Sequence, residues 1–217
     1  MRIGVLGTGV VGQTIGSKLV HLGHEVMMGS RDAANPNAVV WAKEEGVQHA
    51  LFGTFANAAE FGEIIFNCTL GTASLDALRM AGASNLKGKI LVDVATPIDY
   101  SSPDPYLTVC STDSLGEQIQ REFPEALVVK ALNTVNVEVM VDPTRLAETT
   151  DVFVSGNDVN AKATVVNILR NWFGWKSIID LGDISTSRGV EMYSTLWRSL
   201  RRVVASRRFN IKVVRSA

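Results

Sequence analysis

A glycine-rich turn close to the start of the chain is the feature that most constrains its fold. Gly7, Gly9 and Gly12 form the pattern G-x-G-x-x-G between an apolar strand pattern at 2–7 and a helical pattern at 12–23. In such turns the first glycine permits the tight bend, the second lets a pyrophosphate approach the backbone, and the third lets helix and strand pack closely. The helix N-terminus adds free N–H groups and the positive end of its dipole. This context predicts a dinucleotide site formed by Gly7, Gly9, Val10, Val11 and Gly12.

Strand and helix patterns alternate along the rest of the chain. The predicted strands are 2–7, 25–29, 47–53, 63–69, 89–95, 126–133, 151–156, 175–182 and 210–215. The predicted helices are 12–23, 37–46, 55–62, 72–82, 113–123, 159–173 and 186–207. This alternation predicts an α/β Rossmann fold, a doubly wound and mostly parallel sheet with helices on both faces and a C-terminal helix–strand extension. We expect a single domain over 1–217, with a dinucleotide-binding core at 1–141 and its extension at 142–217. Residues 95–107 are the most loop-like stretch.

Composition limits the class of protein and the compartment. Hydrophobic residues make up 46% of the 217 residues, enough for a real core, and the formal net charge is −1. Two cysteines fit a reducing compartment, no secretory signal precedes the first strand, and no apolar run is long enough to span a membrane. No metal-ligand spacing and no nucleic-acid reader motif is present. We expect a soluble, cytoplasmic protein with no metal, no membrane partner and no nucleic-acid partner.

The end of the second strand indicates which dinucleotide binds. NAD-binding proteins place Asp or Glu there to accept a hydrogen bond from the ribose 2′-OH, but this chain has Ser30 and Arg31. A hydroxyl and a guanidinium suit a 2′-phosphate, and arginine forms bidentate, charge-assisted hydrogen bonds to phosphate. Each such bond contributes about 1.5–3 kcal/mol, so a tenfold or larger preference for NADP(H) is expected. The adjacent Asp32 is then a turn or cap residue that points away.

The carboxyl ends of the next strands are where ligands lie in an open parallel sheet. The predicted contacts of the nicotinamide end are Cys68, Thr69, Leu70, Ala95, Thr96 and Asn133. Asn133 is also the predicted catalytic residue, because it is a polar side chain at a strand end. No catalytic triad or tyrosine–lysine pair is evident, which argues against carbonyl reduction with a dedicated proton donor. Hydride transfer between two heterocycles needs little acid–base machinery from the protein.

Basic residues are concentrated at the end of the chain. The last 20 residues contain seven of the 21 Lys and Arg residues and no acidic residue. On the predicted helix 186–207, an apolar face holds Tyr193, Leu196, Leu200 and Val203. The opposite face holds Arg198, Arg201 and Arg202. Three interpretations stay open: a solvated basic face, a dimer surface, or contact with an anionic tail of the hydride acceptor. We expect a homodimer and a small-molecule acceptor.

Several motifs resemble one family over essentially the whole chain. The first is GxGxVGxxIGxxLxxLGHEVMxGSR, followed by SLGEQIQREFPEALVVKALNTVN, DISTSRGVEMYSTLW and FNIKVVR. They resemble the NADPH-dependent reductases of the deazaflavin coenzyme F420, and the fold also resembles the cytosolic domain of the STEAP metalloreductases. The resemblance implies a Rossmann fold that binds NADPH, with Thr8, Ser30 and Arg31 at the 2′-phosphate. It also implies hydride transfer to a planar acceptor stacked on the nicotinamide, with coenzyme F420 or a flavin as co-substrate.

Two other functions stay open at this stage. The chain could reduce an imine, a quinone or a flavin-bound metal with the same cofactor. It could also be a non-catalytic NADP(H) sensor that reports redox state to a partner, because the missing proton donor suits a sensor equally well. Turnover of NADPH separates the enzyme from the sensor.

Overall fold

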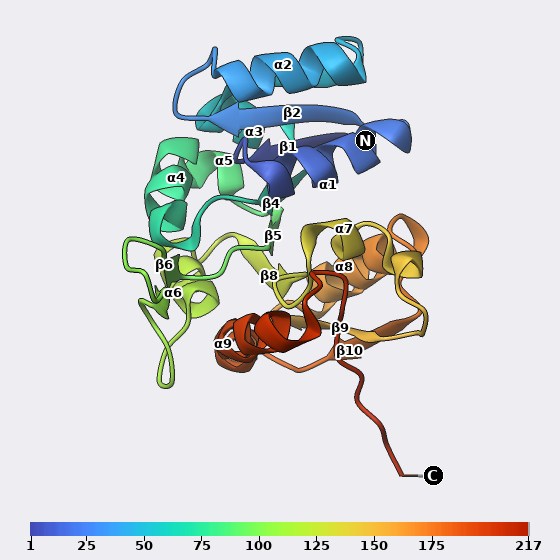
Figure 1. Ribbon diagram of the computed structural model, residues 1–217. Helices are drawn as coiled ribbons and strands as arrows, with labels where there is room; N and C mark the ends of the chain where they lie inside the picture. Colours follow the sequence, from blue (N-terminus) through green and yellow to red (C-terminus); the bar gives the residue numbers. More distant parts are fainter. Residues whose placement is uncertain (217) are drawn as a thin grey trace.

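The computed structural model describes residues 1–216, which form one large mixed sheet covered by helices (Figure 1). The strands of this sheet are β1 (Arg2–Leu6), β2 (Glu25–Ser30), β3 (Ala50–Thr54), β4 (Ile64–Asn67), β5 (Ile90–Asp93), β8 (Leu127–Ala131), β9 (Asp151–Gly156) and β10 (Ser177–Asp180). Their order is β10-β9-β8-β5-β4-β1-β2-β3. The chain order therefore reverses between β1 and β4, the point where doubly wound sheets bind their ligands. The predicted Rossmann fold is confirmed.

The direction of the strands changes once across the sheet. From β3 to β8 all neighbours are parallel, whereas β9 is antiparallel to β8 and β10 is parallel to β9. The segment between β8 and β9 holds only the short helix α7 (Val137–Met140) and a 3₁₀ turn (Pro143–Arg145). Parallel neighbours are usually joined by a longer helical crossover. The sheet is thus mostly parallel, as predicted, with its last two strands reversed.

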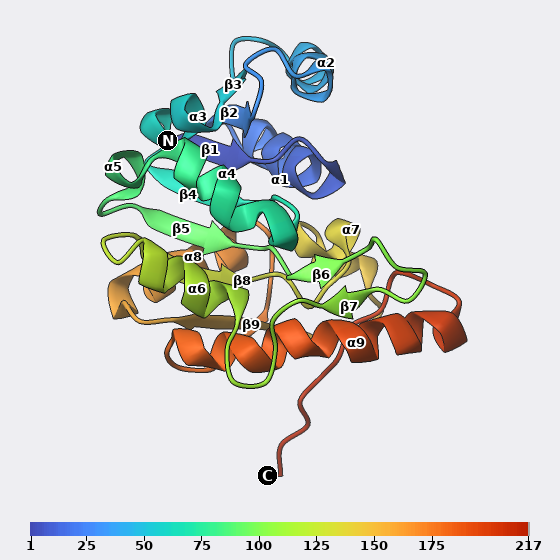
Figure 2. The ribbon, with the colours of Figure 1, turned by 90° about the vertical axis from the view of Figure 1, so that its left-hand side faces the viewer.

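The two faces of the sheet carry different helices, as Figure 2 shows. One face carries α1 (Val10–His21), α2 (Pro36–Glu45) and α8 (Val159–Asn171). The other carries α3 (Phe55–Phe61), α4 (Ser74–Ala81), α5 (Ala83–Leu86) and α6 (Leu115–Glu122). Their buried side chains form two separate apolar clusters, one against each face. Burial of one large aliphatic side chain such as Ile15 contributes about 1.5–3 kcal/mol, so these clusters hold the sheet in place.

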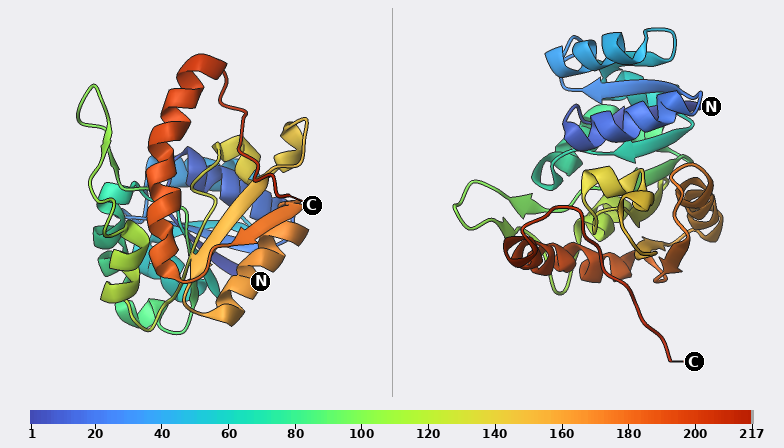
Figure 3. Two further views of the ribbon diagram at one scale, coloured as in Figure 1. Left: turned by 90° about the horizontal axis from the view of Figure 1, so that it is seen from below. Right: turned by 45° about the vertical axis from the view of Figure 1, so that its right-hand side comes forward.

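Of two predictions for irregular segments, one holds with an addition and the other is wrong. The loop-like stretch 95–107 contains a short antiparallel hairpin of β6 (Ile98–Asp99) and β7 (Tyr106–Leu107). The predicted last strand, 210–215, is not a strand. This tail leaves the end of α9 (Ser187–Val204) and runs back beside the start of β9 (Figure 3), where the Asn210 side chain donates to the carbonyl of Asp151 at 2.8 Å. Side-chain contacts of this kind replace the regular ladder that a strand would need.

A buried ion network joins the centre of the sheet to α9. The ammonium of Lys130, on β8, lies 2.5 Å from a carboxylate oxygen of Asp93 on β5 and 2.7 Å from one of Glu191 on α9. It also donates to the carbonyl oxygen of Ala95 at 2.7 Å. The side chains of all three charged residues are at most 1% exposed. Two carboxylates from different elements therefore share one lysine inside the protein.

Glu191 also anchors the N-terminus of α6. Its carboxylate accepts hydrogen bonds from the N–H groups of Leu115 at 2.9 Å and Gly116 at 3.0 Å. These are donors that a helix N-terminus leaves without an internal partner, and negative charge is favourable there. Burial acts to lower the pKa of Lys130, but the carboxylates of Asp93 and Glu191 outweigh it and raise that pKa above its ordinary value. The lysine therefore stays charged and holds α9 against the sheet.

Replacement of Lys130 by methionine should destabilise the protein by about 3–5 kcal/mol, because two buried carboxylates lose their shared partner. Urea denaturation monitored by circular dichroism measures the loss. The triple variant K130M/D93N/E191Q should regain part of the stability, since no buried charge remains. Lys43→Met, at an exposed position of α2, serves as the control. A loss below about 1 kcal/mol in Lys130→Met would contradict this account of the network.

Candidate functional site

A large cavity lies at the carboxyl ends of β1 and β2, against the N-terminus of α1. Its volume is about 800 Å³. We call it the glycine-turn cavity. Its lining residues are Gly7, Thr8, Gly9, Val10, Val11, Ser30, Arg31, Asp32, Asn35, Phe55, Cys68, Thr69, Leu70, Ala73, Asp76, Ala77 and Met80. The predicted contacts of the glycine turn and of the end of β2 therefore come together, except Gly12, which lies behind the turn.

The three glycines have separate roles in this turn. Gly7 has φ +115°, a conformation that L side chains rarely adopt, and a Cβ there would lie 2.7 Å from the carbonyl oxygen of Cys68. A Cβ on Gly12 would collide with the carbonyl oxygen of Gly7, so only glycine lets α1 pack this closely. A Cβ on Gly9 would meet nothing within 4 Å. Gly9 thus borders open space at the N-terminus of α1, which fits a pyrophosphate.

The segment after β2 brings both Arg31 and Asp32 to this cavity, but only the Asp32 side chain is engaged in a local turn. The hydroxyl of buried Ser30 donates to the carbonyl oxygen of Asp32. The Asp32 carboxylate accepts from the N–H of Ala34 at 3.0 Å, so it belongs to a local turn, as predicted. Arg31 is exposed and, among residues 1–216, forms no salt bridge. Its guanidinium is therefore available for an anionic ligand.

A second cavity, of about 380 Å³, lies at the carboxyl ends of β4, β5 and β8 and is bordered by α9. We call it the α9 cavity. Its lining residues are Val11, Cys68, Thr69, Leu70, Gly71, Val94, Ala95, Thr96, Ile98, Tyr100, Asn133, Thr134, Val135, Asn136, Val137, Met140, Ser194, Trp197, Arg198 and Arg201. Val11, Cys68, Thr69 and Leu70 also line the glycine-turn cavity. The two cavities therefore meet at the end of β4.

The predicted residues at the strand ends line this meeting point, but their polar groups are largely engaged. The Thr69 hydroxyl donates to the Asn67 amide oxygen at 2.7 Å. The amide nitrogen of Asn133 donates to the carbonyl oxygen of Val190 at 2.9 Å, which ties the end of β8 to α9. Asn133 lines the α9 cavity, and its catalytic role stays a prediction.

Cys68 is the thiol at the junction of the two cavities. Burial raises the pKa of this thiol well above its ordinary value, and the nearby Asp93 carboxylate acts in the same direction. The side chain therefore stays protonated at neutral pH and presents a weakly polar surface. Within residues 1–216, no group of three or more His, Cys, Asp or Glu side chains is arranged to hold a metal ion.

The orientation of α9 corrects the sequence prediction for its faces. Arg198 and Arg201, for which a solvated face, a dimer surface and contact with the acceptor were all open, line the α9 cavity, whereas Arg202 is exposed. Leu196 and Val203, expected on a packed face, are 52% and 79% exposed. The buried network holds the helix through Glu191, with Leu196 and Val203 outside and Tyr193 and Leu200 half-buried. The homodimer stays a prediction.

Sequence reasoning considered the arginines of this helix but did not group them with Ser194 and Trp197. Ser194, Trp197, Arg198 and Arg201 follow the spacing i, i+3, i+4, i+7, so they share one side of α9. Glu191 begins the same row. The sequence held one signal for this arrangement. Lys130 is a charged residue within a buried strand, and a buried charge needs an oppositely charged partner from another element.

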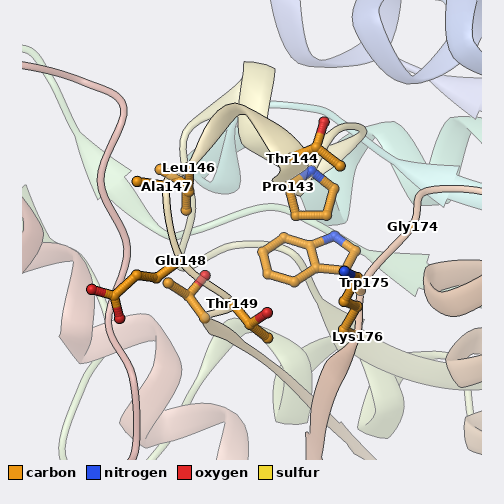
Figure 4. Close-up of a pocket in the computed structure, with 10 residues that line it drawn as sticks. Pro143, Thr144, Leu146, Ala147, Glu148, Thr149, Gly174, Trp175 and Lys176 are labelled. Atoms are coloured by element: carbon orange, nitrogen blue, oxygen red, sulfur yellow. The ribbon is translucent and has the colours of Figure 1, made fainter.

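A third cavity, of about 210 Å³, lies away from this site, between residues 143–150 and 174–176 (Figure 4). Trp175 forms one wall, and its indole N–H donates to the carbonyl oxygen of Met140 at 2.9 Å. Figure 4 shows Pro143 and Thr144 on one side of the indole and Glu148 and Thr149 on the other. This cavity shares no lining residue with the other two, so it is not part of the candidate site.

Known proteins resemble this chain in both sequence and structure. A family model described as "NADP oxidoreductase coenzyme F420-dependent" matches residues 2–97. The chain is 48% identical to a protein of Arthrobacter sp. FB24, whose crystal structure is described as that of a candidate F420-dependent NADP reductase. The two structures agree with a TM-score of 0.93, over 99% of this chain and 100% of that chain. The chain belongs to the F420-dependent NADP oxidoreductase family. It is therefore classed with NADP-dependent oxidoreductases.

More distant relatives share this domain or its fold. The chain is 28% identical to metalloreductase STEAP3 of Rattus norvegicus, over 88% of this chain and 36% of that protein. It is also 28% identical to metalloreductase STEAP2 of Homo sapiens, over 91% of this chain and 37% of that protein. The chain therefore spans little more than a third of the length of these curated relatives. A reductive aminase of Aspergillus terreus, crystallised with NADPH and ethyl-5-oxohexanoate, is 17% identical with a TM-score of 0.66, over 94% of this chain and 62% of that chain. That match shows the fold alone. Each helix in residues 1–216 is too short or too polar to cross a membrane.

Replacement of Arg31 by alanine should weaken NADPH binding tenfold or more and change NADH binding less than twofold. The reason is the loss of charge-assisted hydrogen bonds to the 2′-phosphate, which NADH lacks. Calorimetric titration of both nucleotides measures the effect, with Arg170→Ala on exposed α8 surface as the control. An equal loss for both nucleotides would remove Arg31 from the 2′-phosphate site.

Replacement of Gly9 by valine should abolish nucleotide binding in a folded protein, because the new side chain enters space that is open in the structure. Gly12→Val is the informative contrast. There the side chain meets the Gly7 carbonyl, so it should lower the unfolding temperature. Circular dichroism and calorimetry distinguish the two. Normal NADPH affinity in Gly9→Val would mean that the pyrophosphate lies elsewhere.

Proposed function

We propose that this protein transfers hydride between NADP(H) and a planar heteroaromatic acceptor, with coenzyme F420 as the first candidate and a flavin as the second. The observation that carries the proposal is the shared wall of the two cavities at Cys68, Thr69 and Leu70. A dinucleotide that extends from the glycine turn ends at this wall. An acceptor in the α9 cavity then lies directly beside it.

The residues of the glycine-turn cavity suit NADP(H). The N-terminus of α1 offers N–H donors and the positive end of its dipole beside Gly9. Thr8, Ser30 and Arg31 line the cavity together and would hold a 2′-phosphate, and the Asp32 carboxylate beside them accepts from the Ala34 N–H in a local turn. The end of β2, where NAD-binding proteins carry a carboxylate, thus carries Ser30 and the cation Arg31.

The residues at the junction would orient the nicotinamide and exclude water. NADPH supplies the hydride when it is bound. The walls formed by Val11, Cys68 and Ala95 are small and weakly polar, which favours a ring lying flat between them. Thr96 and Asn133 provide polar groups at the rim of the same wall. We assign Asn133 a positioning role, because its amide joins the end of β8 to α9.

The lining of the α9 cavity favours a heteroaromatic acceptor over a carbonyl or an imine. Among its described residues there is no Asp, Glu, His or Lys to donate a proton to a carbonyl or to bind an iminium cation. Tyr100, the one phenol in the lining, is 60% exposed. Deazaflavin and flavin rings exchange hydride without a dedicated protein acid. The name of the matched family supports the same acceptor class.

The direct test is hydride exchange between NADPH and coenzyme F420, followed by absorbance at the deazaflavin band, with NADH as the control. We expect exchange with NADPH at least tenfold faster than with NADH, because only NADPH engages Arg31. FMN is the second acceptor to be tried. Tight NADPH binding without oxidation by either acceptor would overturn the proposal and favour the redox sensor.

A further inference from the structure

Four polar atoms at the α9 cavity are buried without a hydrogen-bond partner. They are Thr134 Oγ1, Ser194 Oγ, Trp197 Nε1 and Arg198 Nη1. Thr134 follows β8, and the other three lie on α9. Thr134 is 3% exposed and Ser194 is 8% exposed, so solvent does not satisfy these hydroxyl groups. Four of the seven such atoms in the described chain thus lie at this cavity, and the other three, on Ser187, Tyr193 and Asn210, lie outside its lining.

Such groups normally have partners. More than nine in ten buried polar atoms in folded proteins are hydrogen-bonded, and each exception costs about 1–3 kcal/mol. Elsewhere in the described chain the buried charges are fully engaged, as in the network of Asp93, Lys130 and Glu191. Four unpaired atoms on the walls of one cavity indicate that a ligand provides their missing hydrogen-bond partners.

The chemistry of these four groups defines the ligand. An indole N–H and a guanidinium can only donate, and the two hydroxyl groups can donate or accept. The lining contains two arginines, Arg198 and Arg201, and among its described residues no carboxylate. The cavity therefore suits a ligand that presents hydrogen-bond acceptors or negative charge. A cationic ligand would meet two arginines and, among the described lining residues, no carboxylate.

The anchors of α9 hold these groups in place before a ligand arrives. Arg188 forms an ion pair with Glu117 of α6, and Asn133 binds the carbonyl oxygen of Val190. Glu191 joins the buried network one residue later. The first turn of α9 is thus fixed, and the next two turns carry Ser194, Trp197 and Arg198 across the cavity.

We propose that Arg198, assisted by Ser194, Trp197 and Thr134, binds the oxygen-bearing edge of the acceptor ring and stabilises the negative charge that the ring gains on reduction. This inference rests on the proposed function, since it assigns the acceptor to the α9 cavity. In the transfer, the C4–H bond of the reduced nicotinamide breaks, and its hydrogen and electron pair form a bond to an acceptor atom. The charge moves to a ring oxygen or nitrogen, which afterwards takes a proton from water. A preorganised donor aimed at such charge contributes strongly to rate.

The test measures binding, so it does not depend on turnover. Riboflavin and FMN share the oxygen-bearing ring, and only FMN has a phosphate. Calorimetry in saturating NADP⁺ gives the dissociation constant of each for the wild type, Arg198→Gln, Arg198→Lys and Arg202→Gln. Arg202 is the matched control, because it lies on the same helix and its side chain is 78% exposed.

We expect Arg198→Gln to weaken riboflavin and FMN equally, by tenfold or more, and Arg198→Lys to recover part of the loss. Arg202→Gln should change either constant less than twofold, and NADP⁺ affinity should stay unchanged in all variants. Ser194→Ala provides a second variant that removes no charge, with an expected three- to fivefold loss for both ligands.

Three results would overturn the inference: no riboflavin binding by the wild type, unchanged riboflavin binding in Arg198→Gln, or a loss confined to FMN. The last would place a phosphate tail at Arg198 instead of the ring. Failure of the proposed function gives a different pattern, because NADPH would then not be oxidised although riboflavin binding still depended on Arg198.

Discussion

The buried network of Asp93, Lys130 and Glu191 is the interaction on which the site depends. It crosses two parallel strands and reaches α9, so the centre of the sheet and the C-terminal helix share one charged group. Because all three side chains are removed from water, their geometry is tightly constrained and each lone pair needs a partner. Glu191 then fixes both the start of α6 and the rotation of α9. This anchor thus explains why α9 directs Arg198 toward the cavity and leaves Leu196 exposed.

The same sheet brings two kinds of binding surface to one edge. The reversal of strand order between β1 and β4 opens the carboxyl edge, and the glycine turn fills one side of it with backbone donors. The end of β4 forms the boundary, since Cys68, Thr69 and Leu70 line both cavities. One side is built for a phosphate-rich dinucleotide. The other is built from donors on α9 and suits a ring that carries oxygen or charge.

Local rules predicted the fold and the dinucleotide side of the site. The glycine spacing, the strand before it and the helix after it depend on residues close in sequence, and Ser30-Arg31 could be read in the same way. The acceptor side could not be predicted, because it depends on which face of α9 meets the sheet. Hydropathy put Leu196 and Arg198 on opposite faces of the helix but left open what either face contacts, whereas an ion pair between residues 61 apart in sequence, Lys130 and Glu191, ties the helix to the sheet. The predicted strand at 210–215 was wrong for a related reason. Its composition is typical of a strand, but the segment is held beside the start of β9 by side-chain contacts that the sequence pattern does not show.

Isotope transfer would show whether hydride passes directly from the nicotinamide to the acceptor where the two cavities meet. NADPH deuterated at the transferable C4 position would be oxidised in ordinary water with coenzyme F420 as acceptor, and the reduced acceptor would be analysed by mass spectrometry. We expect the deuterium in the reduced acceptor, because the nicotinamide and the acceptor ring would meet where the two cavities join at Cys68–Leu70, and the hydrogen would not pass through solvent. Reduced acceptor without deuterium, or no reduction at all, would contradict it.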